Sequence, residues 1–143
     1  MSKMIFTIFL SMIISFSYGQ AKLFTTRDSL NMFCDKVMQT LMERKFSEAI
    51  QLFRQKSIMD TTTINTIDKT LTEQMTNLQP YYKKLVEYEL IDEVTIKNSV
   101  VKRRYLLKFE NYFLTFNFVL YNNRTGWTVS NFNYYDNPNE LFQ

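Results

Sequence analysis

The sequence predicts an α+β fold in which N-terminal helices pack on an antiparallel four-stranded sheet. Before Pro80, apolar residues recur every three or four positions, which is typical of amphipathic helices. After Pro80 they recur at every second position, which is typical of half-buried strands. Because the chain has 143 residues, the usual length of one domain, we expect both halves to share a single core.

The composition excludes several kinds of active site. The chain has no histidine, one cysteine and two glycines. Histidine is the commonest general base and metal ligand, cysteine-type zinc sites need several thiolates, and phosphate-binding loops need several glycines. We therefore expect neither a bound metal nor a cofactor, and we assign no catalytic residue.

The first nineteen residues have the pattern of a secretory signal peptide. Lys3 precedes an apolar run at positions 4–14, and the small residues Ser17 and Gly19 follow. The run is shorter than the ~20 residues that span a bilayer, which disfavours the alternative of an uncleaved anchor. We expect residues 1–19 to be removed and residues 20–143 to form the domain. The protein would then be exported from a bacterium, to the periplasm or beyond, with no membrane span after cleavage.

The first predicted helix covers residues 28–44, with Thr26 or Asp28 as its N-cap. Its apolar stripe includes the only cysteine, Cys34, which stands beside Phe33. Free cysteine is among the residue types most often buried, so we expect this thiol to be part of the core.

Two further helices are predicted before the strands begin. A short one starts at Ser47, and a third covers residues 65–79, where apolar residues again recur every three or four positions. Pro80 is expected to end the third helix because proline lacks the backbone N–H that continues one. Residues 57–63, which are polar and β-branched, are expected to form a loop.

Four strands are predicted as an antiparallel meander, since the breaks between them are short enough for hairpins. They cover residues 86–96, 101–109, 112–121 and 127–135. In the last strand the alternation changes phase, which indicates either a bulge near Ser130 and Asn131 or burial of both faces. The tail from Asp136 is expected to be frayed.

Charge and hydrophobicity together predict the register of the hairpins. Glu89 would lie opposite Lys108 on one face of the sheet, with Glu93 opposite Arg104, because opposite charges across strands stabilise a register. The apolar pairs expected on the other face are Tyr88–Phe109, Leu90–Leu107 and Ile96–Val101 in the first hairpin, and Phe109–Tyr112, Leu107–Leu114 and Tyr105–Phe116 in the second.

In this register two charged residues interrupt the apolar face. Asp92 lies opposite Tyr105, and Arg103 is its diagonal neighbour, within side-chain reach. A charge on an apolar face is costly unless it is paired. We therefore expect Asp92, Arg103 and Tyr105 to form one polar cluster under the helices. The cluster is either the floor of a ligand pocket or a structural pair that satisfies itself.

Several segments resemble the NTF2-like (SnoaL-like) superfamily, in particular its small exported bacterial members of unknown function. The resemblance covers roughly residues 28–135 and rests on residues 46–53 (FSEAIQLF), 105–110 (YLLKFE) and 126–132 (GWTVSNF). It implies a cone in which helices close over a curved sheet and leave a cavity. Enzymes of that superfamily commonly use Asp and His in the cavity, and without histidine this mechanism does not carry over.

Three functions remain open at this stage. The first is an exported binding or scaffold module, whose aromatic-lined cavity between helices and sheet takes an unknown small apolar or anionic ligand. The second is a carboxylate-based hydrolase or isomerase that uses Asp92. The third is a protein-interaction module that forms a homodimer through the outer face of the sheet. The candidate cavity residues are Asp92, Arg103, Tyr105, Phe116 and Tyr88.

Nucleic acid is not an expected partner. The chain has 17 basic and 14 acidic residues, a net charge of +3, and its one basic cluster is the run 102–104. Strand alternation divides that run between two faces of the sheet, so it does not form the basic patch that nucleic-acid binding needs.

Overall fold

The structure, a computed structural model, describes residues 23–142, so the predicted signal peptide lies outside the described residues. The helical segments are α1 (Arg27–Met42), α2 (Phe46–Gln51), η1 (Leu52–Gln55), α3 (Thr61–Tyr82) and η2 (Pro138–Phe142). The strands are β1 (Leu85–Ile96), β2 (Val100–Phe109), β3 (Phe113–Asn122) and β4 (Trp127–Tyr135). They form one antiparallel sheet in the order β1-β2-β3-β4. The α+β class and the four-stranded meander are therefore confirmed.

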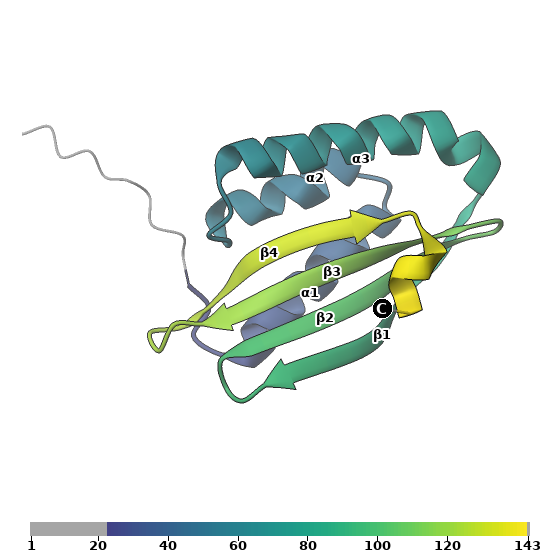
Figure 1. Ribbon diagram of the computed structural model, residues 1–143. Coiled ribbons are helices and arrows are strands. Elements are labelled where there is room, and N and C mark those ends of the chain that lie inside the picture. The colour runs from purple at the N-terminus through teal and green to yellow at the C-terminus, as the bar shows by residue number, and fades with distance from the viewer. Residues whose placement is uncertain (1–22, 143) are drawn as a thin grey trace, which may run out of the picture.

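The helices cover one face of this sheet. Figure 1 shows α1 crossing behind the strands, and it contacts both edge strands, β1 and β4. Helices α2 and α3 pack against each other beyond β4. Of the described helical segments, the short C-terminal η2 is the one on the opposite face, called here the outer face (Figure 1). Within residues 23–142, none of the helices combines the length and the apolar character that a membrane span requires.

Helix α1 agrees with its sequence pattern. Thr26 caps it, since its Oγ1 accepts a hydrogen bond from the Ser29 N–H at 3.1 Å. The predicted apolar stripe is buried, and Cys34 with it. Burial raises the pKa of the Cys34 thiol to about 12, so it stays protonated at neutral pH.

Helix α3 is longer at both ends than the sequence predicts. It begins at Thr61, inside the expected loop, because the Asp60 carboxylate accepts from the Thr63 N–H at 2.9 Å and caps the helix. It also continues through Pro80 to Tyr82. In the last turn proline removes one backbone hydrogen bond and the helix tolerates that loss. The chain leaves the helix at Lys83, whose φ of 64° is incompatible with a right-handed turn.

The predicted register holds for the second hairpin and fails for the first. Between β2 and β3, Tyr105 pairs with Phe116 and Leu107 with Leu114, as expected. Between β1 and β2 the pairing shifts at two places, after Leu85 and after Leu90. Each shift is a bulge, in which one strand has an extra residue and its side chains change faces. The expected pairs of Tyr88 with Phe109 and Leu90 with Leu107 are therefore wrong.

The last strand contains the predicted bulge. Val119 pairs with Asn131 and Leu120 with Val129, so Ser130 is the extra residue of β4. Its hydroxyl donates to the Val119 carbonyl at 3.1 Å, which explains how the strand changes phase without losing its partner.

The C-terminal tail is ordered, in contrast to the expected fraying. Residues Pro138–Phe142 form η2. The Arg104 Nη1 donates to the Leu141 carbonyl at 3.0 Å, and the Tyr112 hydroxyl donates to the Asp136 carbonyl. Because η2 follows the sheet, the expectation that all helical segments precede the strands is wrong as well.

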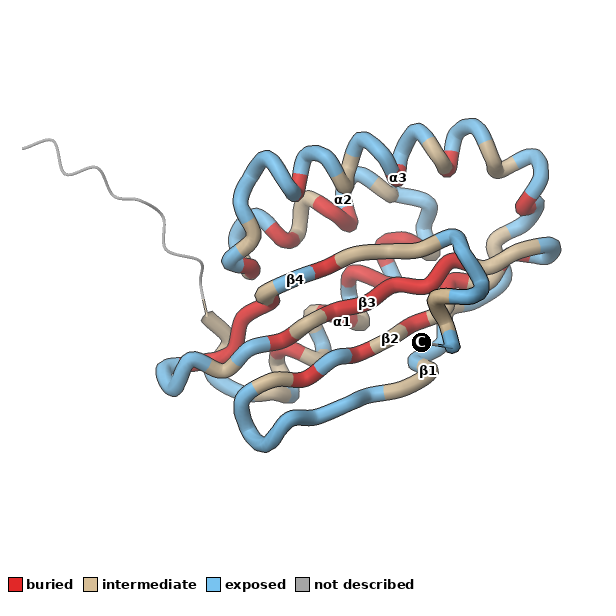
Figure 2. Tube along the Cα trace, viewed as in Figure 1, coloured by how far each residue is buried: buried red, intermediate tan, exposed pale blue. Residues whose placement is uncertain are grey.

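Aromatic rings fill the space between α1 and the sheet. The rings of Phe118 and Phe132 are 4.9 Å apart, and Phe53 from η1 is 4.5 Å from Phe132. Figure 2 shows the buried segments concentrated along β2 and β3, whereas β1 is exposed over most of its length. Among the strands, β2 and β3 therefore supply most of the buried apolar residues, and β1 supplies none of them.

Candidate functional site

The polar cluster under α1 contains Arg103 and Tyr105, as predicted, but its acids are not the predicted one. The Arg103 Nε donates to the Tyr105 hydroxyl at 3.0 Å, and its Nη1 donates to Glu93 at 2.6 Å. The Tyr105 hydroxyl donates in turn to Asp35 of α1 at 2.8 Å. Arg27, at the start of α1, pairs with the same Glu93. This cluster, Arg27–Asp35–Glu93–Arg103–Tyr105, joins α1 to both strands of the first hairpin.

The cluster has the chemistry of a structural tie. Arg103 is 6% exposed, and its two carboxylate neighbours compensate the charge that burial would otherwise penalise. Burial, together with the hydrogen bond to Asp35, raises the pKa of Tyr105 well above its ordinary value. The phenol therefore remains neutral and acts as a donor. Among the described residues, no group of acids and thiols is placed to hold a metal ion.

Asp92 lies on the outer face, away from Arg103 and Tyr105. The bulge after Leu90 places Asp92 opposite Arg104, and its two carboxylate oxygens accept from Arg104 Nε at 2.8 and 2.9 Å. The expectation that Asp92 shares a cluster with Arg103 is therefore wrong. The same bulge turns Glu93, expected on the outer face, toward the helices.

We expect the Asp92–Arg104 pair to contribute stability that acid removes. Hydrogen bonding to Arg104 lowers the pKa of Asp92 below its ordinary value. The contribution is present above about pH 4, the pKa in the unfolded chain, and is lost as the pH falls through the lower folded pKa. Asp92→Asn should therefore lower the free energy of unfolding at pH 7 by at most about 1 kcal/mol. The variant should also flatten its pH dependence below pH 4, in urea titrations at several pH values.

Glu87→Gln is the matched control for that measurement. Glu87 pairs with Lys108 on the same face, but its side chain is 59% exposed. We expect that variant to follow the wild-type curve. Parallel curves for Asp92→Asn and wild type below pH 4 would contradict the prediction.

The other candidate cavity residues lie in the aromatic core. Tyr105 and Phe116 are fully buried, and Tyr88 is half-buried with its ring 6.2 Å from that of Tyr105. Phe116 packs 5.8 Å from Phe132. A ligand cavity beside these rings stays a prediction. The hollow described next lies elsewhere and is lined by none of these residues.

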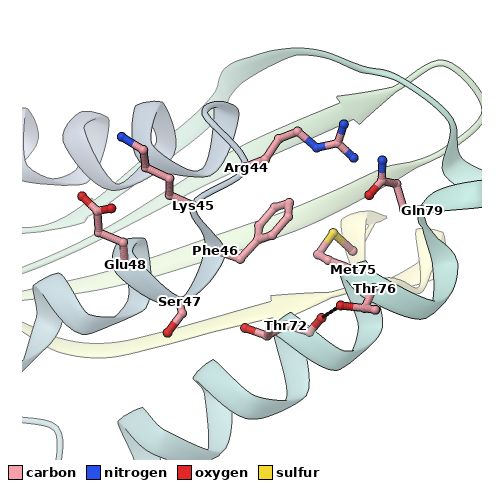
Figure 3. Close-up of a pocket in the computed structure, with 9 residues that line it drawn as sticks. All are labelled: Arg44, Lys45, Phe46, Ser47, Glu48, Thr72, Met75, Thr76 and Gln79. Carbon is pink, nitrogen blue, oxygen red and sulfur yellow. Dashed lines mark hydrogen bonds between the residues drawn. The ribbon is translucent and has the colours of Figure 1, made fainter.

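A groove of about 540 Å³ opens between the α1–α2 turn and the second half of α3. Figure 3 shows the Phe46 ring and the Met75 thioether facing its interior. Both contact the core, so the apolar part of the groove is rigidly supported. Polar side chains from both helices complete the lining: Ser47, Glu48, Thr72, Thr76 and Gln79.

Arg44 supplies the available positive charge of this groove. In Figure 3 its guanidinium extends toward Gln79 on the opposite wall. Within the described part of the chain it makes no ion pair. The neighbouring Lys45, in contrast, donates to Glu43 at 2.7 Å, and this bond raises the pKa of Lys45 and lowers that of Glu43. The groove therefore offers a free guanidinium beside an apolar surface.

Sequence reasoning missed this groove, although a signal was present. Arg44 ends the first predicted helix and Lys45 follows it, and Lys83 and Lys84 follow the third. Cations are common after helix C-termini because the helix dipole favours them there. What the sequence did not show is that the ends of α1 and α3 lie side by side.

The described residues thus form a two-layer α+β domain with a cationic, partly apolar surface groove. No protein-family model, curated protein or solved structure matches the chain.

Proposed function

We propose that this domain is a binding module that holds a small anionic ligand with an apolar portion in the groove between the α1–α2 turn and α3. The observation that carries the proposal is the unpaired Arg44 guanidinium beside Phe46 and Met75. An arginine presents several donors in a fork that suits a carboxylate or phosphate. Binding pockets typically combine an apolar lining with a few such polar groups, in volumes of roughly 300–1,000 Å³.

The alternative of a hydrolase or isomerase based on Asp92 has lost its main support. The Arg104 guanidinium engages both oxygens of that carboxylate, and its lowered pKa makes it a weaker base. Tyr105, which the sequence places in one cluster with Asp92, lies on the other face of the sheet.

Decanoate is a suitable probe of the groove because it joins one carboxylate to an apolar tail. We expect isothermal titration calorimetry, below the micellar concentration of decanoate, to show one site per chain. Arg44→Gln should weaken binding about fivefold or more, the ratio that corresponds to about 1 kcal/mol for a partly exposed ion pair.

Arg124→Gln is the matched control for that titration. Arg124 lies in the β3–β4 loop and, like Arg44, has a left-handed backbone, with φ of 76° against 63°. The two substitutions therefore change charge and backbone strain alike, and only the groove differs. Equal affinities of the two variants, or no binding to the wild type at millimolar decanoate, would refute the proposal.

A second candidate function is homodimerisation through the outer face of the sheet. Ile96, Val100 and Tyr121 are partners across β1, β2 and β3, so they form one apolar row on that face. Ile96 is 63% exposed there, and contiguous exposed apolar surface marks interaction sites. Sedimentation equilibrium over a hundredfold concentration range tests this. A monomer throughout would refute it, and a dimer should dissociate on Tyr121→Lys.

Membership of the NTF2-like superfamily and export from the cell are further proposals. An NTF2-like cone is supported by the order of three α-helices followed by a four-stranded antiparallel meander. Export is supported by the charge and hydropathy pattern of residues 1–19. A ligand site that faces solvent is compatible with such a location.

A further inference from the structure

A second hollow adjoins the groove on the far side of Arg44. It has a volume of about 500 Å³ and shares Arg44, Thr76 and Gln79 with the groove. Its remaining lining comes from Pro80, Lys83 and Lys84, where α3 ends and the chain turns into β1. Arg44 therefore stands at the junction of two hollows, one partly apolar and one cationic.

The lysines of the second hollow are available to a ligand. Both are exposed, and within residues 23–142 neither forms an ion pair. The turn that presents them is held by backbone bonds, from the Lys83 N–H to the Gln79 carbonyl at 2.8 Å and from the Glu110 N–H to the Lys84 carbonyl at 2.9 Å. Lys83 has φ of 64° and ψ of −141°, a conformation that costs a non-glycine residue free energy. The turn is therefore held in a strained form, and both of its lysines line the same hollow as Arg44.

We infer that the two hollows form one bipartite site for an elongated dianion, with one negative group at Arg44, a second negative group at Lys83 and Lys84, and the apolar body between them beside Gln79 and Pro80. The inference rests on the proposed function and adds the second anionic group. A ligand with one negative group pairs with the Arg44 guanidinium alone, and the ammonium groups of Lys83 and Lys84 then stay hydrated. A purely structural explanation of the two lysines is that the dipole of α3 favours cations after its C-terminus. That explanation does not account for their place in a hollow that Arg44 also lines.

Dicarboxylates test this against a monocarboxylate of matched length. The probes are suberate, sebacate and dodecanedioate, compared with decanoate, each titrated calorimetrically into the wild-type protein. We expect the best dicarboxylate of the series to bind about fivefold more tightly than decanoate, since a second partly exposed ion pair contributes a factor of that size. A dicarboxylate series that binds no better than decanoate would overturn the inference.

Variants of the lysines separate the two proposals. In the double variant Lys83→Gln with Lys84→Gln, we expect the advantage of the dicarboxylate to disappear while the affinity for decanoate stays unchanged. The control is Lys97→Gln with Lys102→Gln, which removes the same charge away from the hollows and replaces, like Lys83, a residue of positive φ at Lys97. If both double variants weaken all probes equally, the effect is one of net charge and the second subsite does not exist. If decanoate itself fails to bind the wild type, the proposed function fails, independently of the lysines.

Discussion

Phe118→Ala is expected to lower the free energy of unfolding by about 3–5 kcal/mol, the usual cost of removing a fully buried phenylalanine ring. Phe118 is at the centre of β3 and is completely buried. Its ring packs against Tyr105 at 5.4 Å and Phe132 at 4.9 Å. These neighbours belong to rigid strands, which cannot close the cavity that the substitution leaves.

Urea unfolding measures this loss, with the fluorescence of Trp127 and far-ultraviolet circular dichroism as two independent signals. Trp127 is the only tryptophan of the chain and is buried, so unfolding changes its surroundings. Tyr121→Ala is the control on the same strand, because that side chain faces outward and is 41% exposed. A loss below about 1 kcal/mol for Phe118→Ala would mean that the rings do not form a tightly packed core.

Arg103→Met is expected to cost about 2–3 kcal/mol, less than the removal of one member of a fully buried ion pair. The guanidinium is the common partner of Glu93, Tyr105 and Asp35. Without it Asp35 has no ion-pair partner among the described residues, and Glu93 is paired with Arg27 alone. The Glu93 and Asp35 side chains are 27% and 43% exposed, so water compensates part of the loss.

The matched control is Lys102→Met, which removes one charge from the adjacent, outward-facing position of β2. We expect it to change stability by less than about 0.5 kcal/mol. A double-mutant cycle of Arg103→Met with Glu93→Gln isolates the pair, and a coupling near zero would contradict the assignment of the cluster as a tie between helix and sheet.

The central strands were predictable because their pattern is continuous. Apolar residues alternate without interruption along β3, and along β2 only Arg103 interrupts them, so only one register buries Leu107 against Leu114. The alternation of β4 changes phase in the sequence itself, so a bulge near Ser130 was one of the two predicted alternatives, and the structure has it.

The first strand was not predictable, because its apolar residues near the turn lie on the outer face and not on the face that the helices cover. Val94 and Ile96 read as core residues, yet they are 54% and 63% exposed on the outer face. Near the end of β1, the helix-covered side is instead occupied by Glu93, which Arg103 requires as a partner. Contacts with another strand and with a helix stabilise this bulge, so the alternation of apolar and polar residues along β1 does not reveal it.

The groove was harder to predict than the first strand, because segments far apart in the sequence form it. Its two walls come from the α1–α2 turn and from α3, and the sequence predicted both helices, α3 with shorter bounds, without predicting that they lie side by side. The second hollow needs, in addition, that α3 pass through Pro80, where the sequence predicts an end.

No residue of β1 is fully buried, and besides its ladder to β2 and the packing of Leu85 and Tyr88 the strand is held by ion pairs on both of its faces. The rest of the sheet is held mainly by apolar burial. Concentrated sodium chloride screens the ion pairs and leaves the ladder and the apolar packing intact. Concentrated salt should therefore weaken the attachment of β1 and leave the other three strands in place.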